Sequence, residues 1–148
     1  MSEPIRTFEQ LVAWQKARDL TRLIYKITSE GPLARDFRLS GQMRDAGVPA
    51  MSNTAEGFER SNAGEFFQFL SIAKSSCAEL RSHLYVALDV GYLECAVFED
   101  AMGKARETAA VIGGLRAAVK RHRDAVRRGR NRVDGTQGTA QPVREGRR

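Results

Sequence analysis

The side chains best suited to catalysis or binding lie in one polar stretch of the sequence, between Gln42 and His83. Arg44, Asn53, Glu56 and Glu79 fall on two consecutive segments with helical periodicity. Asn53 falls on an apolar stripe, where burial demands hydrogen-bond partners. The pattern therefore predicts a polar network between two helices that sets their register. The functional alternative for the same residues is a binding surface for RNA or for a partner protein.

Residues for catalysis are sparse. His83 and His122 are the only histidines, and His83 lies four residues after Glu79, which on a helix is more often a surface contact than an acid–base pair. The metal, phosphate-loop and nucleophile motifs that contain His, Gly or Ser at fixed spacing are missing. Cys77 lies on an apolar stripe and is expected to pack as a small hydrophobic residue. We expect no enzyme activity, no cofactor, no metal and no small-molecule substrate.

Four long helices are expected to position these residues. Thr7 followed by Gln10 fits a capping box at the start of the first helix, and Glu30-Gly31-Pro32 ends it. The second helix spans Phe37 to Glu59 with Pro49 inside it, and Asn62 caps the third, which ends before Gly91. The inward positions have three- and four-residue spacing. They are Ala13, Ala17, Leu20, Ile24 and Ile27; Leu39, Met43, Ala46, Ala50, Asn53 and Gly57; Phe66, Phe69, Ala73, Cys77, Leu80, Leu84 and Ala87; and Val97, Ala101, Ala105, Thr108, Ile112, Leu115 and Val119.

Short connections make consecutive helices antiparallel neighbours. The sequence therefore predicts an all-α fold, an antiparallel up-down-up-down four-helix bundle with a disordered basic C-terminal tail. The expected divisions are an N-terminal extension at 1–7, the bundle at 8–122 and the Arg-rich tail at 123–148.

The positive charge belongs to the C-terminal part of the chain. Residues 1–119 contain 14 Lys and Arg against 15 Asp and Glu, whereas residues 120–148 contain 10 against 3. A cationic arm of this kind binds phosphates by counterion release, and it contains no aromatic residue for base stacking. The candidate nucleic-acid contacts are Lys120, Arg121, Arg123, Arg127, Arg128, Arg130 and Arg132. The alternative is a tail that only increases solubility.

Apolar residues outside the main stripes suggest self-association. Trp14 and Leu11 on the first helix, and Phe67, Leu70 and Tyr85 on the third, add a second apolar face. The alternative is a wide core stripe in a monomer. Two isolated cysteines, no secretory leader and no apolar run of roughly 18–20 residues predict a cytoplasmic protein without a membrane anchor.

A set of short motifs in a fixed order resembles one known family. The motifs are Phe8-Glu9-Gln10-Leu11-x-x-Trp14-Gln15-Lys16-Ala17, Gln42-Met43-Arg44, Ser52-Asn53-x-Ala55-Glu56-Gly57, Glu65-Phe66-x-x-Phe69-Leu70, Glu79-Leu80 and Leu88-Asp89-x-Gly91-Tyr92-Leu93. Over about residues 8–120 the chain resembles the bacterial "four helix bundle protein" family, named for open reading frames in intervening sequences of 23S ribosomal RNA genes. That family is similar to the accessory proteins of diversity-generating retroelements, which form pentamers and bind a reverse transcriptase and nucleic acid.

The resemblance implies fold and assembly directly, and function only by analogy. The expected function is a non-enzymatic oligomeric adaptor, a pentamer by resemblance, that binds RNA or a ribonucleoprotein with help from the basic tail. The expected partners are other copies of the chain and RNA or a reverse transcriptase. The alternative is a protein–protein interaction module that binds no nucleic acid.

Overall fold

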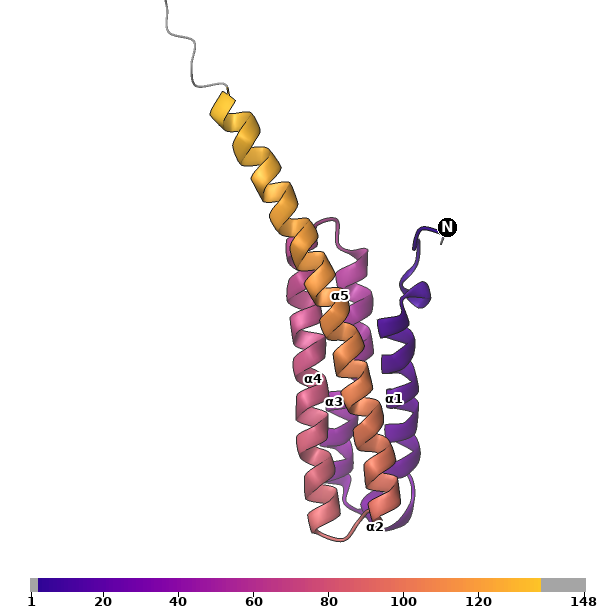
Figure 1. Ribbon diagram of the computed structural model, residues 1–148. Helices are drawn as coiled ribbons and strands as arrows, with labels where there is room; N and C mark the ends of the chain where they lie inside the picture. Colours follow the sequence, from indigo (N-terminus) through magenta and orange to yellow (C-terminus); the bar gives the residue numbers. More distant parts are fainter. Residues whose placement is uncertain (1–2, 137–148) are drawn as a thin grey trace, which may run out of the picture.

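Four long helices in up-down-up-down order form the body of the protein (Figure 1). The computed structural model describes residues 3–136. The long helices are α1 (Val12–Thr28), α3 (Phe37–Glu59), α4 (Ala63–Asp89) and α5 (Cys95–Thr136). Helix α3 packs on α1 and α4, and α5 packs on α4 and α1, so each long helix contacts two others. The predicted antiparallel four-helix bundle is confirmed.

Two short elements are additions to the predicted order. The 3-10 turn η1 (Phe8–Gln10) precedes α1, and α2 (Gly31–Arg35) connects α1 to α3. The Gln10 Oε1 atom accepts the Thr7 backbone N–H at 3.2 Å, as a capping box requires. That box opens η1 and not α1, because the backbone returns to an extended conformation at Leu11.

The ends of α4 follow the predicted capping chemistry. Asn62 Oδ1 accepts the Glu65 N–H at 2.8 Å. At the other end Gly91 has a φ of 79°, which a residue with a Cβ adopts only at a cost. The Tyr92 N–H donates to the Ala87 carbonyl at 2.8 Å, and the Gly91 N–H donates to the Leu88 carbonyl at 3.0 Å. These two bonds form a Schellman motif, which ends α4 and starts the turn toward α5.

Most residues of the predicted inward stripes form one core. Asn53, Phe66 and Phe69 are only half-buried, whereas Thr54 and Leu70 are buried beside them. All five inward residues of α1 are buried, as are Met43, Leu80, Leu84 and Ile112. In α5 the predicted stripe is one residue off at its start, since Val97 is 37% exposed whereas Phe98 is 5% exposed. Phe98 packs beside the Tyr85 ring with a centroid separation of 5.2 Å. Phe98 therefore takes the inward position that the sequence pattern assigned to Val97.

The residues that suggested a second apolar face have partners within the chain. Leu11 and Leu70 are buried, and Trp14 packs edge-on against Phe8 at 5.1 Å between ring centroids. Tyr85 is the member of this set that stays nearly half exposed, at 46%. These residues thus complete the bundle, and other exposed side chains must carry any argument for self-association.

Candidate nucleic-acid interface

Helix α5 extends well past the turn between α3 and α4 (Figure 1). The expected boundary at residue 122 needs correction, because residues 123–136 are helical. The remaining tail, 137–148, lies outside the described residues. Adding residues to an existing helix is favourable compared with starting a new one, and Arg is a strong helix former. Asp124 lies four residues before Arg128, in the orientation that stabilises a helix.

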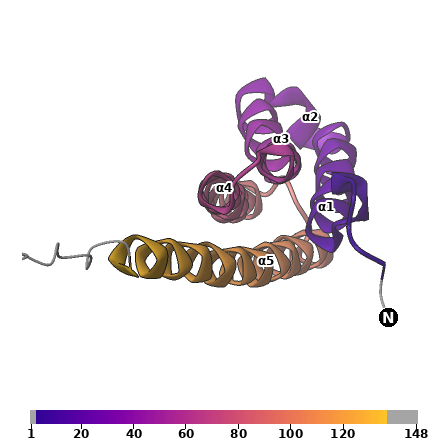
Figure 2. The same cartoon turned by 90° about the horizontal axis from the view of Figure 1, so that it is seen from above.

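The extension leaves the bundle on the side of α4 (Figure 2). Helical geometry sorts its seven candidate cations into two rows. One row contains Lys120, Arg123, Arg127 and Arg130, and the other contains Arg121, Arg128 and Arg132. Arg123 is half-buried, and the other six are exposed. The structure therefore brings the predicted cations together along one rigid element.

Phe67 on α4 connects the bundle to the base of the extension. The guanidinium carbons of Arg116 and Arg123 lie 4.2 and 4.5 Å from the Phe67 ring centroid. Arg116 Nε also donates to Ser71 Oγ at 2.8 Å, and Arg123 Nε donates to Asp124 Oδ1 at 3.1 Å. These contacts fix the direction in which α5 leaves the bundle. Neither Arg116 nor the role of Phe67 was inferred from the sequence, although Arg116 continues the first cationic row by one turn.

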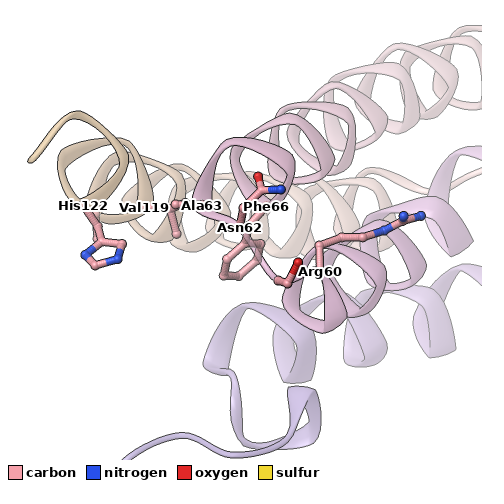
Figure 3. A pocket seen from close by; sticks show the side chains of 8 residues that line it. Arg60, Asn62, Ala63, Phe66, Val119 and His122 are labelled. Atoms are coloured by element: carbon pink, nitrogen blue, oxygen red, sulfur yellow. The ribbon is translucent and has the colours of Figure 1, made fainter. Parts of the chain in front are cut away.

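A groove separates the extension from the α3–α4 turn. Its apolar part has a volume of about 370 Å³ and includes Phe66 from α4 and Val119 and His122 from α5 (Figure 3). A neighbouring polar part of about 480 Å³ is lined on the α5 side by Arg123, Arg127 and Arg130. The groove thus joins an apolar floor to a row of guanidinium groups.

The predicted polar network does not form. Within residues 3–136, no hydrogen bond or ion pair joins any two of Arg44, Asn53, Glu56 and Glu79. Arg44 Nε donates to Thr28 Oγ1 at 2.9 Å, and its guanidinium lies 4.5 Å from the centroid of the Tyr25 ring. Arg44 therefore joins α3 to α1 and not to α4.

The other three members of that set are also placed apart. Asn53 Nδ2 donates to the Pro49 carbonyl at 2.9 Å within α3. Glu56 is exposed and lines a shallow pocket with Glu59 and Phe8. Glu79 Oε1 lies 3.4 Å from His83 Nε2, at the surface of α4. The polar residues in this stretch stabilise separate parts of the bundle.

The cysteines and the possible metal ligands of residues 3–136 form no reactive site that the structure shows. Burial raises the pKa of the Cys77 thiol to about 11, despite the nearby Arg81 charge, so Cys77 is a neutral core residue at pH 7. Cys95 is exposed and free. Between residues 3 and 136, no cluster of three or more His, Cys, Asp or Glu side chains is arranged to hold a metal ion. No helix in the same range combines the length and apolar character needed to cross a bilayer.

The comparison with family models gives a match over residues 9–114, to the family described as 23S rRNA-intervening sequence protein. The chain belongs to this family. The match ends before the cationic part of α5, so the extension lies outside the region that defines the family. No match was found among curated proteins.

A solved structure supports the fold independently. It is described as a protein with unknown function from the S23 ribosomal protein family of Bacteroides thetaiotaomicron. The TM-score is 0.65 at 19% identity, covering 70% of this chain and 97% of that chain. At this identity the likeness shows the bundle fold alone.

Proposed function

We propose that this protein is a non-enzymatic, cytoplasmic adaptor that assembles from several copies and binds RNA or a ribonucleoprotein through the α5 extension. The observation that carries the proposal is the helical extension itself, which presents two rows of cations, all exposed except the half-buried Arg123. Membership of a family named for 23S rRNA intervening sequences is consistent with an RNA context.

The extension is suited to phosphate contacts without base recognition. From Lys120 to Arg130 the first row spans about 15 Å at 1.5 Å per residue. Contacts of Lys and Arg to phosphates supply affinity and position, whereas sequence is read from base edges or stacked bases. The part of α5 from Lys120 to Gly135 contains no Phe, Tyr or Trp. The expected binding is therefore strong at low salt and weakly dependent on sequence.

Exposed apolar side chains on the bundle favour self-association. Phe37 is 85% exposed, and Ile72 is 51% exposed on the outer side of α4. Assembly of several chains would present several extensions to one RNA, and linked weak contacts add by effective concentration. Multiple copies would thus convert weak phosphate contacts into useful affinity.

The first prediction concerns the salt dependence of RNA binding. Simultaneous substitution of Arg127, Arg128 and Arg130 by Gln should reduce the slope of log affinity against log salt by about 2, since three phosphate contacts are lost. The measurement is fluorescence anisotropy with a labelled single-stranded RNA at several salt concentrations.

A matched variant controls for net charge. Arg22, Arg35 and Arg38 are also exposed, and they belong to α1, α2 and the first turn of α3, so their simultaneous substitution by Gln should leave the slope nearly unchanged. Equal slopes for both triple variants would contradict a role for the extension. Native mass spectrometry of the same sample gives the number of copies, and a monomer would contradict the assembly part of the proposal.

RNA binding by none of these proteins would instead favour the protein–protein module. In that case, co-purification from the source cells should recover a protein partner that stays bound after nuclease treatment.

A further inference from the structure

A second concentration of positive charge lies on the bundle itself, in a groove between α4 and α5. The groove has a volume of about 340 Å³. Its lining contains three cations, two hydroxyl groups and no carboxylate, namely Lys74, Arg81, Arg116, Ser71, Ser75, Ala78 and Ala109. Residues 1–119 are therefore locally cationic at this groove, although their net charge is close to zero.

Arg81 lines this groove and has one unpaired buried donor. Its Nε atom is buried and has no hydrogen-bond partner among the described residues. A buried donor without a partner destabilises the folded chain, and more so when the group is charged. It is the one buried side-chain nitrogen or oxygen atom in residues 3–136 that lacks a partner. Because the atom is shielded from solvent, an acceptor bound in the groove would reach it only after the Arg81 side chain moves.

The other two cations are held in place by packing. Lys74 Nζ lies 3.6 Å from the position that a Cβ on Gly113 would occupy, so the ammonium group sits against the α5 backbone. Arg116 is fixed by Ser71 and by the Phe67 ring. Three like charges around one groove repel one another, and a bound anion would offset that repulsion by attracting each of them.

We propose that the α4–α5 groove binds a phosphate group. Guanidinium and ammonium groups are the side chains that bind phosphate oxygens most strongly, whereas the Ser75 hydroxyl already donates to the Ser71 carbonyl at 3.0 Å. The phosphate belongs either to a free pyrophosphate-like ligand or to the backbone of a nucleic acid. The second source rests on the proposed function, because Arg116 lies one turn before Lys120 and the groove would then extend the cationic row onto the bundle.

The experiment measures the binding of two probes to the full chain by isothermal titration calorimetry. The probes are inorganic pyrophosphate and a single-stranded oligouridylate. Substitution of Lys74 and Arg81 together by Gln should weaken binding of at least one probe by about tenfold or more, as expected for the loss of charge-assisted hydrogen bonds. A control variant with Lys26 and Arg38 replaced by Gln removes two exposed cations elsewhere and should bind like the unmodified chain.

The two probes distinguish the sources. Loss of pyrophosphate binding alone identifies a free phosphate ligand, whereas loss of oligouridylate binding identifies a nucleic-acid backbone. Unchanged binding of both probes by the Lys74/Arg81 variant, or an equal loss in the control variant, would overturn the proposal. Circular dichroism melting of each variant verifies that the bundle is folded.

This outcome is separable from the function proposed for the extension. The Arg127/Arg128/Arg130 variant keeps every residue of the α4–α5 groove, so it should retain pyrophosphate binding even where it loses RNA. Conversely, if the Lys74/Arg81 variant loses pyrophosphate binding but still binds RNA, the function proposed for the extension is unaffected.

Discussion

Replacement of Gly57 by alanine is expected to lower the free energy of unfolding by about 1–2 kcal/mol. A Cβ at this position would lie 2.8 Å from Phe66 Cδ2 and 2.8 Å from Phe69 Cβ. The Phe69 Cβ atom is fixed to the α4 backbone, so the contact is relieved only when α3 and α4 move apart. The overpacking cost of about 2–3 kcal/mol exceeds the gain of roughly 1 kcal/mol in helix propensity.

Gly41 on the same helix provides the matched control. A Cβ on Gly41 would have no neighbouring atom within 4 Å, so Gly41→Ala should raise stability by up to about 1 kcal/mol through helix propensity alone. Chemical denaturation of both variants measures the difference in sign. Stabilisation by both substitutions would show that α3 and α4 adapt to the added methyl group without loss.

This opposite behaviour of two glycines on one helix illustrates what the sequence alone predicts. The stripe that contains Met43, Ala46 and Ala50 also contains Gly57, so its inward direction follows from periodicity. The close approach of the Phe66 and Phe69 side chains depends on the distance between two helices. Periodicity does not determine that distance, because it emerges from the packing of both stripes together.

The polar residues show the same limit more strongly. The sequence predicts that Arg44 lies between the second and third long helices, and this was wrong, because periodicity along one helix does not indicate which neighbouring helix a long side chain contacts. The structure gives it Thr28 and Tyr25 on α1. The cationic groove is a similar case, since Arg116 is distant in sequence from Lys74 and Arg81 and meets them only when α4 and α5 pack. The periodicity of one helix does not predict which residues of two helices will lie close together.

The end of α5 was mispredicted for a different reason. Low apolar content suggested that residues after His122 lack enough burial to offset chain entropy. That argument applies to a segment that folds on its own. Here the segment is the last part of a 42-residue helix whose first part packs in the bundle, and its base contacts Phe67 through Arg116 and Arg123. Local continuation and two aromatic contacts outweigh the poor burial.

Substitution of Phe67 by leucine should therefore loosen the base of the extension while the bundle stays folded. Leucine keeps an apolar side chain at the position but removes the ring that both guanidinium groups contact. Each contact is worth about 0.5–1 kcal/mol, so local opening of α5 should become easier by about 1–2 kcal/mol. Backbone amide exchange between residues 116 and 136 should then accelerate by roughly 5- to 30-fold, since 1.4 kcal/mol corresponds to a factor of about ten.

Tyr85→Leu is the control for this effect, because Tyr85 contacts the other end of α5 through Phe98. Hydrogen–deuterium exchange followed by mass spectrometry should show acceleration near residue 98 for Tyr85→Leu and after residue 116 for Phe67→Leu. Unchanged exchange after residue 116 in a folded Phe67→Leu protein would mean that helix continuation alone orders the extension. If acceleration is found, RNA affinity should also fall, because cations on a rigid helix lose less conformational entropy on binding than cations on a flexible chain.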